Sequence, residues 1–221
     1  MSPPGLIAPD DQWSLILSCE IGCFRTKFSV HEMRRVNRPP LRGMTPTMLA
    51  DVRQEFRRHQ RLAQEAMTQL DDAGFFQRPA PHVNPVALIV KHLGGNLRSR
   101  WTGFLTSDGE KPDRDRDREF VLTDADTRDH LMAAWQQGWA ALWGTLESLS
   151  DCGLEQRVTI RGEGHTVRQA LMRGLTHVAY HTGQILYVVR LLRPESRWLT
   201  IPPDQSRNHP GDYFQSRTPQ R

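Results

Sequence analysis

The chain has 221 residues, of which 38% are hydrophobic, so it is long enough for one domain with a full core. Its net charge of +4 does not indicate a nucleic-acid partner, because basic and acidic residues alternate along the chain and the aromatic residues follow helical core spacing. No apolar run approaches the ~20 residues of a membrane helix, and Cys19, Cys23 and Cys152 form no Cys-x-x-Cys pair. These features favour a cytoplasmic protein without a disulfide framework or zinc finger.

Residues 1–43 differ from the rest, with two proline pairs and weak periodicity. We expect a disordered or loosely structured extension, and Met44 is a candidate translational start. The alternatives are an organellar transit peptide or a basic arm. Asp10 and Asp11 stand where a secretory signal would carry positive charge, so no signal peptide is expected.

The first predicted helix opens at Thr45-Pro46 and ends near Gln69 to Asp72. Its apolar positions alternate at spacings of four and three, which is typical of a helix in a bundle. His59 lies on the inward stripe, and we interpret it as a core residue.

A second helix is predicted from Pro85, capped by Asn84, through the sequence PVALIVKHLGGNLRSRWTGFL. His92 lies beside its apolar stripe, and Asn96 lies one turn further on. Gly94 and Gly95 each cost about 1 kcal/mol relative to Ala inside a helix. We therefore expect a neighbouring helix or a ligand to approach the backbone there.

The polar loop TSDGEKPDRDRDREF follows, with alternating Asp and Arg from Asp113 to Arg118. One interpretation is a solvated loop with local ion pairs. The other is a functional loop over the mouth of the bundle, in which Arg116, Arg118 and Lys111 hold an anionic group of a substrate.

A third helix is predicted from about Asp124 to Ser150, capped by Thr123 with Asp126 three residues on. The segment RVTIRGEGHTV predicts a β-hairpin that turns at Gly162 to Gly164. His165 is interpreted as an exposed residue before the next helix, and residues 207–221 as a flexible tail.

The last predicted helix runs from Thr166 to Arg193 and begins with a Thr-x-x-Gln capping box. His177 and His181 lie one turn apart on one face, so both imidazoles can reach the same metal ion. A buried pair without a metal would leave ring nitrogens without partners. Val178 stands where a His-Glu-x-x-His peptidase carries its general base, which disfavours that class. His92 is the natural third ligand.

Two stretches carry a resemblance, NPVALIVKHLGGNLRSRWTGFLTSDGEKPDRDRDREF and HVAYHTGQILYVVRLL. With one histidine on the second helix and a His-x-x-x-His pair on the last, residues 44–206 resemble the DinB-like superfamily of metal-binding four-helix bundles, and especially a bacterial branch of it without established function. The superfamily name records induction by DNA damage and does not demonstrate DNA binding.

The resemblance implies an all-α, up-down-down-up four-helix bundle, often a homodimer, that holds a divalent ion such as zinc or nickel. It implies that His92, His177 and His181 are the metal ligands. Asn96, Trp101, Gly183 and Gln184 also match positions typical of the branch, and Asn96, Trp101 and Gln184 are candidates for substrate contacts or for contacts to the ligands. His59 falls where such proteins tend to carry another residue type. Some members of the superfamily resemble transferases of low-molecular-weight thiols such as bacillithiol, mycothiol or glutathione, and others resemble hydrolases or isomerases.

Three neutral histidines leave a divalent ion its full charge and at least one open position. Zinc, nickel, iron and manganese all accept three imidazoles. Such an ion activates water, which gives a hydrolase, or holds a thiolate, which gives a transferase. No carboxylate lies within one turn of His177 or His181, which favours the transferase. We therefore expect a metal-dependent thiol S-transferase acting on small electrophiles; a metal-dependent hydrolase and a non-enzymatic metal-binding stress-response bundle are the alternatives.

Overall fold

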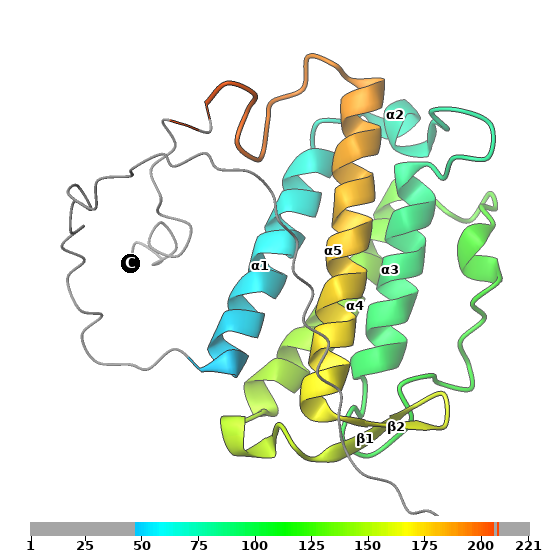
Figure 1. Ribbon diagram of the computed structural model, residues 1–221. Coiled ribbons are helices and arrows are strands. Elements are labelled where there is room, and N and C mark those ends of the chain that lie inside the picture. The colour runs from blue at the N-terminus through cyan, green and yellow to red at the C-terminus, as the bar shows by residue number, and fades with distance from the viewer. Residues whose placement is uncertain (1–46, 206, 208–221) are drawn as a thin grey trace, which may run out of the picture. The chain divides into compact units, whose positions relative to one another are not determined.

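The computed structural model describes residues 47–205 and residue 207 (Figure 1). Their fold is mostly helical, with one small antiparallel sheet. The elements in chain order are α1 (Met48–Met67), α2 (Asp72–Phe76), α3 (Val86–Trp101), the 3-10 turn η1 (Arg118–Phe120), α4 (Arg128–Ser148), the 3-10 turn η2 (Asp151–Gly153), β1 (Arg157–Ile160), β2 (Glu163–Thr166) and α5 (Val167–Leu192). The extension predicted over residues 1–43 and nearly all of the predicted tail lie outside the described residues. Helix α1 begins at Met48 after the extended Thr47, which caps it, and so later than the predicted start at Thr45-Pro46.

Side-chain caps set where three of the four long helices begin, at Thr47 for α1, Thr127 for α4 and Thr166 for α5. The cap predicted at Asn84 for α3 is wrong, because the residue before that helix is Pro85 and no side chain caps it. The capping box predicted for α5 is confirmed, because Thr166 and Gln169 exchange both of its hydrogen bonds. The cap predicted for α4 is wrong. The carboxylate of Asp126 accepts hydrogen bonds from the backbone and hydroxyl of Thr123, which forms a turn, and the helix starts only after Thr127, whose hydroxyl caps it.

The end predicted for α3 is also too late. The helix stops at Trp101, because Thr102 is extended and Gly103 has a φ of +57°. A left-handed residue breaks the hydrogen-bond ladder, and glycine adopts it without strain.

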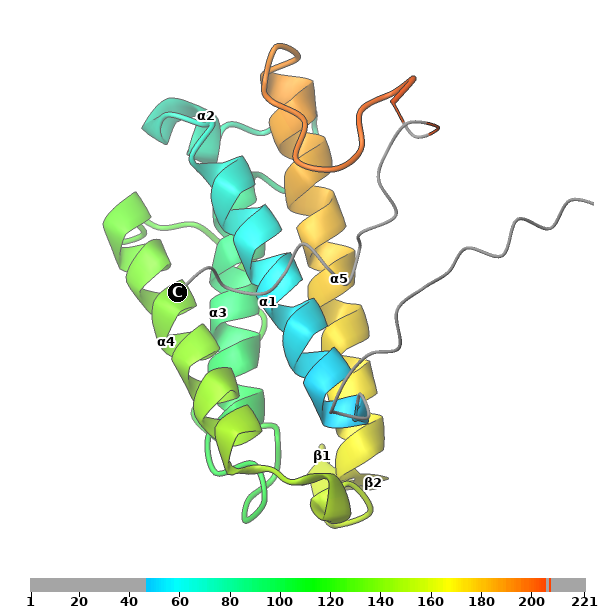
Figure 2. The same ribbon diagram turned by 90° about the vertical axis from the view of Figure 1, so that its left-hand side faces the viewer.

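The four long helices lie side by side in two pairs of opposite direction (Figures 1 and 2). Helices α1 and α5 run one way, and α3 and α4 run the other way. Helix α1 packs on α5, and α3 packs on both α4 and α5. Arg53 of α1 donates to the carbonyl oxygens of Leu146 and Leu149 at the end of α4, and Arg128 of α4 donates to those of Met67 and Leu70 at the end of α1. These bonds join α1 and α4 at both ends.

Large aromatic side chains fill the space between the helices. Trp101, Trp135 and Trp139 are buried, and Phe56 packs edge-on against the rings of Trp101 and Trp139, with centroids 6.3 and 6.4 Å away. Leucine, valine and alanine residues from all four long helices complete this core. The interior around these aromatic side chains is therefore apolar and densely packed.

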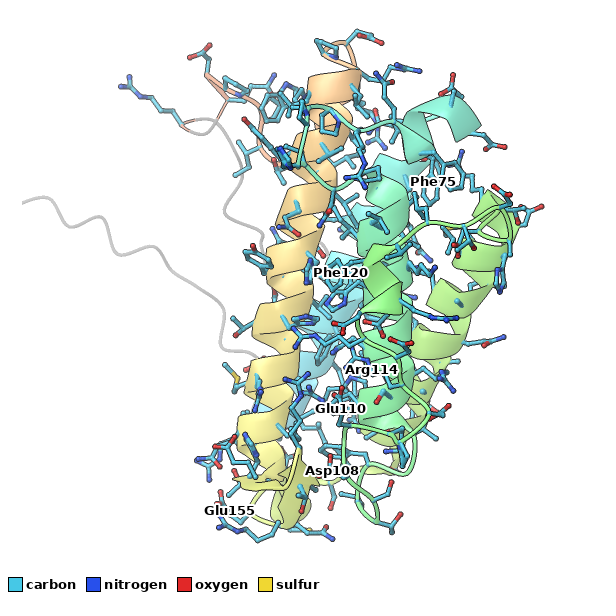
Figure 3. All side chains as sticks on the ribbon, turned by 90° about the vertical axis from the view of Figure 1, so that its right-hand side faces the viewer. Phe75, Asp108, Glu110, Arg114, Phe120 and Glu155 are labelled. Carbon is cyan, nitrogen blue, oxygen red and sulfur yellow. The ribbon has the colours of Figure 1, made fainter. Side chains whose placement is uncertain are left out.

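The connection between α3 and α4 has to return the chain along the whole of α3, because the two helices are neighbours that run in parallel. A 16-residue helix is roughly 24 Å long. Residues 102–127, here called the return segment, cover this distance, and η1 within it packs on α3. Figure 3 shows Asp108, Glu110, Arg114 and Phe120 following one another along it. The acidic and basic loop is thus laid along α3.

The predicted hairpin forms, but its turn lies elsewhere. Ile160 pairs with Glu163, so the turn consists of Arg161 and Gly162, with φ of +57° and +74°, and not of Gly162 to Gly164. Two residues of positive φ make the turn type that matches the twist of a two-stranded ribbon. The carboxylate of Asp108 accepts hydrogen bonds from both turn amides at 2.8 Å, which ties the hairpin to the return segment. None of the described helices is both long and apolar enough to cross a lipid bilayer.

Candidate metal centre and adjoining cavity

Three histidines from two helices meet between α3 and α5. The Nε2 atom of His177 lies 3.2 Å from Nε2 of His92 and 3.2 Å from Nε2 of His181. One ring nitrogen from each of the three falls within a cluster no wider than 4.8 Å. His92 and His181 are buried. The structure therefore brings together the three residues predicted as ligands.

The ring of His92 is held by the return segment. Its Nδ1 atom lies 2.8 Å from the carboxylate of Glu119, which can only accept a hydrogen bond, so Nδ1 carries the proton. Arg114 donates to both oxygens of Glu119 at 2.8 Å, and the ring of Phe120 lies 4.7 Å from that of His92. Burial opposes ionisation of Glu119, but the bonds from Arg114 and His92 outweigh it and lower its pKa. The lone pair on Nε2 of His92 consequently faces the other two histidines.

Gly95 makes room for this arrangement. A Cβ atom at residue 95 would collide with the carboxylate of Glu119. At residue 94 it would lie 3.1 Å from the backbone of Ala134 in α4. The approach of a helix predicted for this glycine pair is confirmed at Gly94, whereas Gly95 is approached instead by a side chain of the return segment.

His181 is oriented in a similar way from its own helix. Its Nδ1 atom lies 2.7 Å from the amide oxygen of Gln184, one turn further along α5, so Nδ1 again carries the proton. Its Nε2 lone pair therefore faces His177. His177 has no such partner, since its Nδ1 atom is buried without a hydrogen bond among the described residues.

The donor set fits a divalent cation. Glu119 and Gln184 fix the rings of His92 and His181 so that both present an Nε2 lone pair. A neutral His177 can donate a hydrogen bond to only one of these two nitrogens. In either tautomer of His177, a buried acceptor is therefore left without a partner. A tetrahedral zinc ion with Zn–N distances of ~2.05 Å places its ligand nitrogens about 3.3 Å apart, close to the two distances of 3.2 Å.

Burial keeps the rings of His177 and His181 neutral, as metal binding requires. Burial, followed by the proximity of His181 and His92, lowers the pKa of His177 to about 3. Burial also lowers the pKa of His181 to about 4, although the bond to Gln184 opposes the shift. Near pH 7 both rings therefore present lone pairs.

A cavity of about 140 Å³ adjoins the histidines. Its walls are formed by His92, Asn96, Arg100, Arg116, Arg161, Arg173 and His177. They come from α3, the return segment, the hairpin turn and α5. Among the residues that the structure describes, four guanidinium groups and no carboxylate line this cavity.

The other sequence candidates lie in different places. Asn96 lines the cavity, and Gln184 binds His181. Trp101 is buried in the core against Phe56 and does not line the cavity. His59 is half-buried on α1. His165 was predicted to be exposed, but it lies in β2 and is half-buried. Neither histidine belongs to the cluster.

Sequence reasoning missed most of the residues that surround the histidines. Glu119 and Arg114 hold His92, and Arg100, Arg161 and Arg173 contribute charge to the cavity. One signal was available: the Asp-Arg alternation ends at Arg118, and Glu119 is followed by the apolar run Phe120, Val121 and Leu122. A buried acid next to an aromatic residue is typical of a segment that packs on the protein.

Comparison with known proteins gives a family. Residues 44–205 match the model of a family described as "Protein of unknown function (DUF1572)". No curated protein and no solved structure matches the chain. The matched range includes all three histidines and every residue of the cavity wall. The chain belongs to the DUF1572 family.

Proposed function

We propose that this protein is a metal-dependent enzyme of the DinB-like superfamily, built as an up-down-down-up four-helix bundle, and that it transfers a low-molecular-weight thiol to a small electrophile. The observation that carries the proposal is the meeting of three imidazole nitrogens, with two of the rings oriented by hydrogen bonds to Glu119 and Gln184. A zinc or nickel ion suits this site best, and a homodimer is the expected assembly.

Each residue has a distinct task in this proposal. His92, His177 and His181 hold the ion, and Glu119 and Gln184 orient two of these rings. When bound, the ion supplies a positive charge that favours the deprotonated form of a thiol at neutral pH. Asn96, on the cavity wall beside His92, offers an amide to the substrate.

The absence of an available base on the cavity wall favours thiol transfer over hydrolysis. Within the described residues the wall contains no carboxylate. Both oxygens of Glu119 are engaged by Arg114 and His92, and its lowered pKa makes it a poor proton acceptor. A hydrolase that takes its general base from a side chain is therefore less well supported.

Elemental analysis of the purified protein tests the ion. We expect one zinc or nickel ion per chain, and less than a tenth of that content in each of His92→Ala, His177→Ala and His181→Ala. His165→Ala is the control, since this histidine lies outside the cluster and its variant should keep the full content. Full metal content in all three cluster variants would overturn the site.

Thiol conjugation tests the reaction. Metal-loaded protein is assayed with glutathione, bacillithiol and mycothiol against chlorodinitrobenzene and monobromobimane, and His177→Ala is assayed in parallel. We expect at least one thiol to be conjugated in a metal-dependent manner. Silence across the panel, together with a large fall in Tm on chelation, would favour the non-enzymatic metal-binding bundle.

A further inference from the structure

The cavity next to the histidines has a chemical character that the metal ligands do not explain. Its wall carries Arg100, Arg116, Arg161 and Arg173, so a cluster of like charges surrounds a small space. Like charges repel, and grouping them is costly unless an opposite charge is present. The acidic residues nearby supply too little negative charge to balance these arginines.

Two of the nearby acids are already shared or engaged. Glu110 binds Arg114 at 3.0 Å and reaches Arg161 only at 3.4 Å, and Glu119 is held by Arg114 and His92. A third acid, Glu163, lies 3.8 Å from Arg173. Of the four arginines on the wall, only Arg161 and Arg173 thus have an acidic partner among the described residues.

Arg100 is the most informative of these residues. It is only 7% exposed, its Nε atom is buried without a hydrogen bond, and none of the described residues forms an ion pair with it. Burial, followed by the charges of Arg173 and Arg114, lowers its pKa to about 10. A guanidinium group that lines a cavity in this state lacks the acceptor that buried cations normally have.

We propose that this cavity is an anion-binding subsite that holds a carboxylate or phosphate group through Arg100 and Arg116, with Arg161 and Arg173 at its rim. Arg116, like Arg100, has no ion-pair partner among the described residues. Guanidinium groups bind carboxylate and phosphate with paired hydrogen bonds. The cavity of about 140 Å³ accommodates such a group and not a whole cofactor.

Because His92 and His177 share the wall, an anion held there lies beside the metal ligands. The substrate class that follows is a small molecule with a carboxylate or phosphate group near its reacting atom. This last step rests on the proposed function, whereas the anion subsite does not.

Titration calorimetry at low ionic strength tests the subsite with inorganic phosphate and malonate as probes. Both are titrated into metal-free protein and into zinc-loaded protein. We expect one of them to bind saturably with one site per chain in the metal-free form. The preferred probe identifies the anion as phosphate or carboxylate.

Matched arginine variants locate the binding. Arg100→Met and Arg116→Gln should each weaken the affinity for the preferred probe tenfold or more and leave the zinc content unchanged. The controls are Arg98→Met, two residues away on α3 and paired with Asp113, and Arg118→Gln, two residues away in η1 and paired with Asp115. Both should stay within twofold of the wild type. If Arg100→Met does not fold, Arg116→Gln and the double variant Arg116→Gln, Arg161→Gln decide alone, because both side chains are exposed.

These experiments distinguish failure of the proposed anion subsite from failure of the proposed metal-dependent function. No saturable binding by the metal-free wild type, or an equal loss in the controls, overturns the subsite whatever the metal content is. Loss of the metal assignment leaves the metal-free titrations valid.

Discussion

Helix α3 makes two contacts of opposite character. Towards α4 it presents glycine and leucine, and the backbones approach so closely that a Cβ atom on Gly138 would lie 2.7 Å from the carbonyl oxygen of Gly94. Towards α5 and the return segment it presents His92, Asn96 and Arg100. One helix thus joins an apolar, fully packed interface to a polar one that contains a cavity.

This difference shows where the molecule can accommodate chemistry. Buried polar side chains cost free energy unless they are paired, so they require a rigid support. The packed contact between α3 and α4 supplies that rigid support. The polar side chains at the contact between α3 and α5 depend on it. Changes in the first interface should alter stability, and changes in the second should alter ligand binding.

The largest expected effect is on the packed side. Gly138→Leu places a side chain against the backbone of Gly94 and should force the helices apart, at a cost of about 3 kcal/mol in the free energy of unfolding. Gly144→Ala on the same helix meets nothing within 4 Å and should stabilise the protein by about 1 kcal/mol. Urea denaturation measures both. Equal stability of the two variants would show that the close approach is not a constraint.

On the polar side, the metal-free protein should lose stability as the pH falls. The pKa values of about 3 for His177 and about 4 for His181 lie below the ordinary value of 6.5, so the unfolded chain binds more protons below pH 6.5. The stabilisation is therefore present above pH 6.5 and is lost towards pH 4, by up to about 3 kcal/mol for His181.

Glu119, whose pKa is lowered from 4.5, adds a loss of the same sign only at lower pH. Between pH 6.5 and 4.5 the histidines therefore dominate, and Tm measured across this window checks them. His181→Gln should flatten the profile, and the exposed His130→Ala should not. A Tm that rises on acidification would contradict the burial argument.

A smaller effect is expected where the return segment meets the site. Glu119→Gln keeps the shape but removes the charge that orients His92, and it should weaken zinc binding about tenfold in competition with a chromogenic chelator. Glu110→Gln is the control, because Glu110 also binds Arg114 but does not touch a histidine. Its zinc affinity should change less than twofold. If the two variants behave alike, Glu119 has no specific role.

Gly95→Ala should weaken zinc binding while adding a stabilising contribution to the helix. The added methyl group displaces the carboxylate of Glu119, so zinc binding should weaken, by less than in Glu119→Gln. Alanine is favoured over glycine inside a helix by about 1 kcal/mol, which should offset the strain in the free energy of unfolding. Chelator competition and urea denaturation on the same sample measure the two effects. Unchanged zinc affinity would show that Glu119 can move without consequence.

The long helices and the histidine cluster were predictable because their signals are local. His177 and His181 share a helix face by spacing alone, and the capping box of Thr166 lies within four residues. His92 was placed by its position beside an apolar stripe and by family resemblance. Apart from the resemblance, these inferences depend on the helical repeat, which the sequence displays directly.

The surroundings of the cluster were not predictable, because they depend on where the return segment and the hairpin dock. Arg116 reaches the cavity as the functional-loop interpretation predicted. Arg118 instead pairs with Asp115, and Lys111 donates to the backbone carbonyl of Asp108. Alternating Asp and Arg residues look alike in sequence, and only packing against α3 separates those that face the site from those that face solvent.

The hairpin turn shows a compromise between the stability of the fold and the binding of a ligand. Arg161 has a φ of +57°, a conformation that asparagine adopts more readily than arginine. Asparagine would be expected there if the turn only had to connect two strands, and Arg161→Asn should raise Tm slightly while lowering affinity for an oxyanion. Selection for a cation at the rim of the cavity, in place of the residue that the turn conformation favours, would show that this loop has lost some stability in exchange for anion binding.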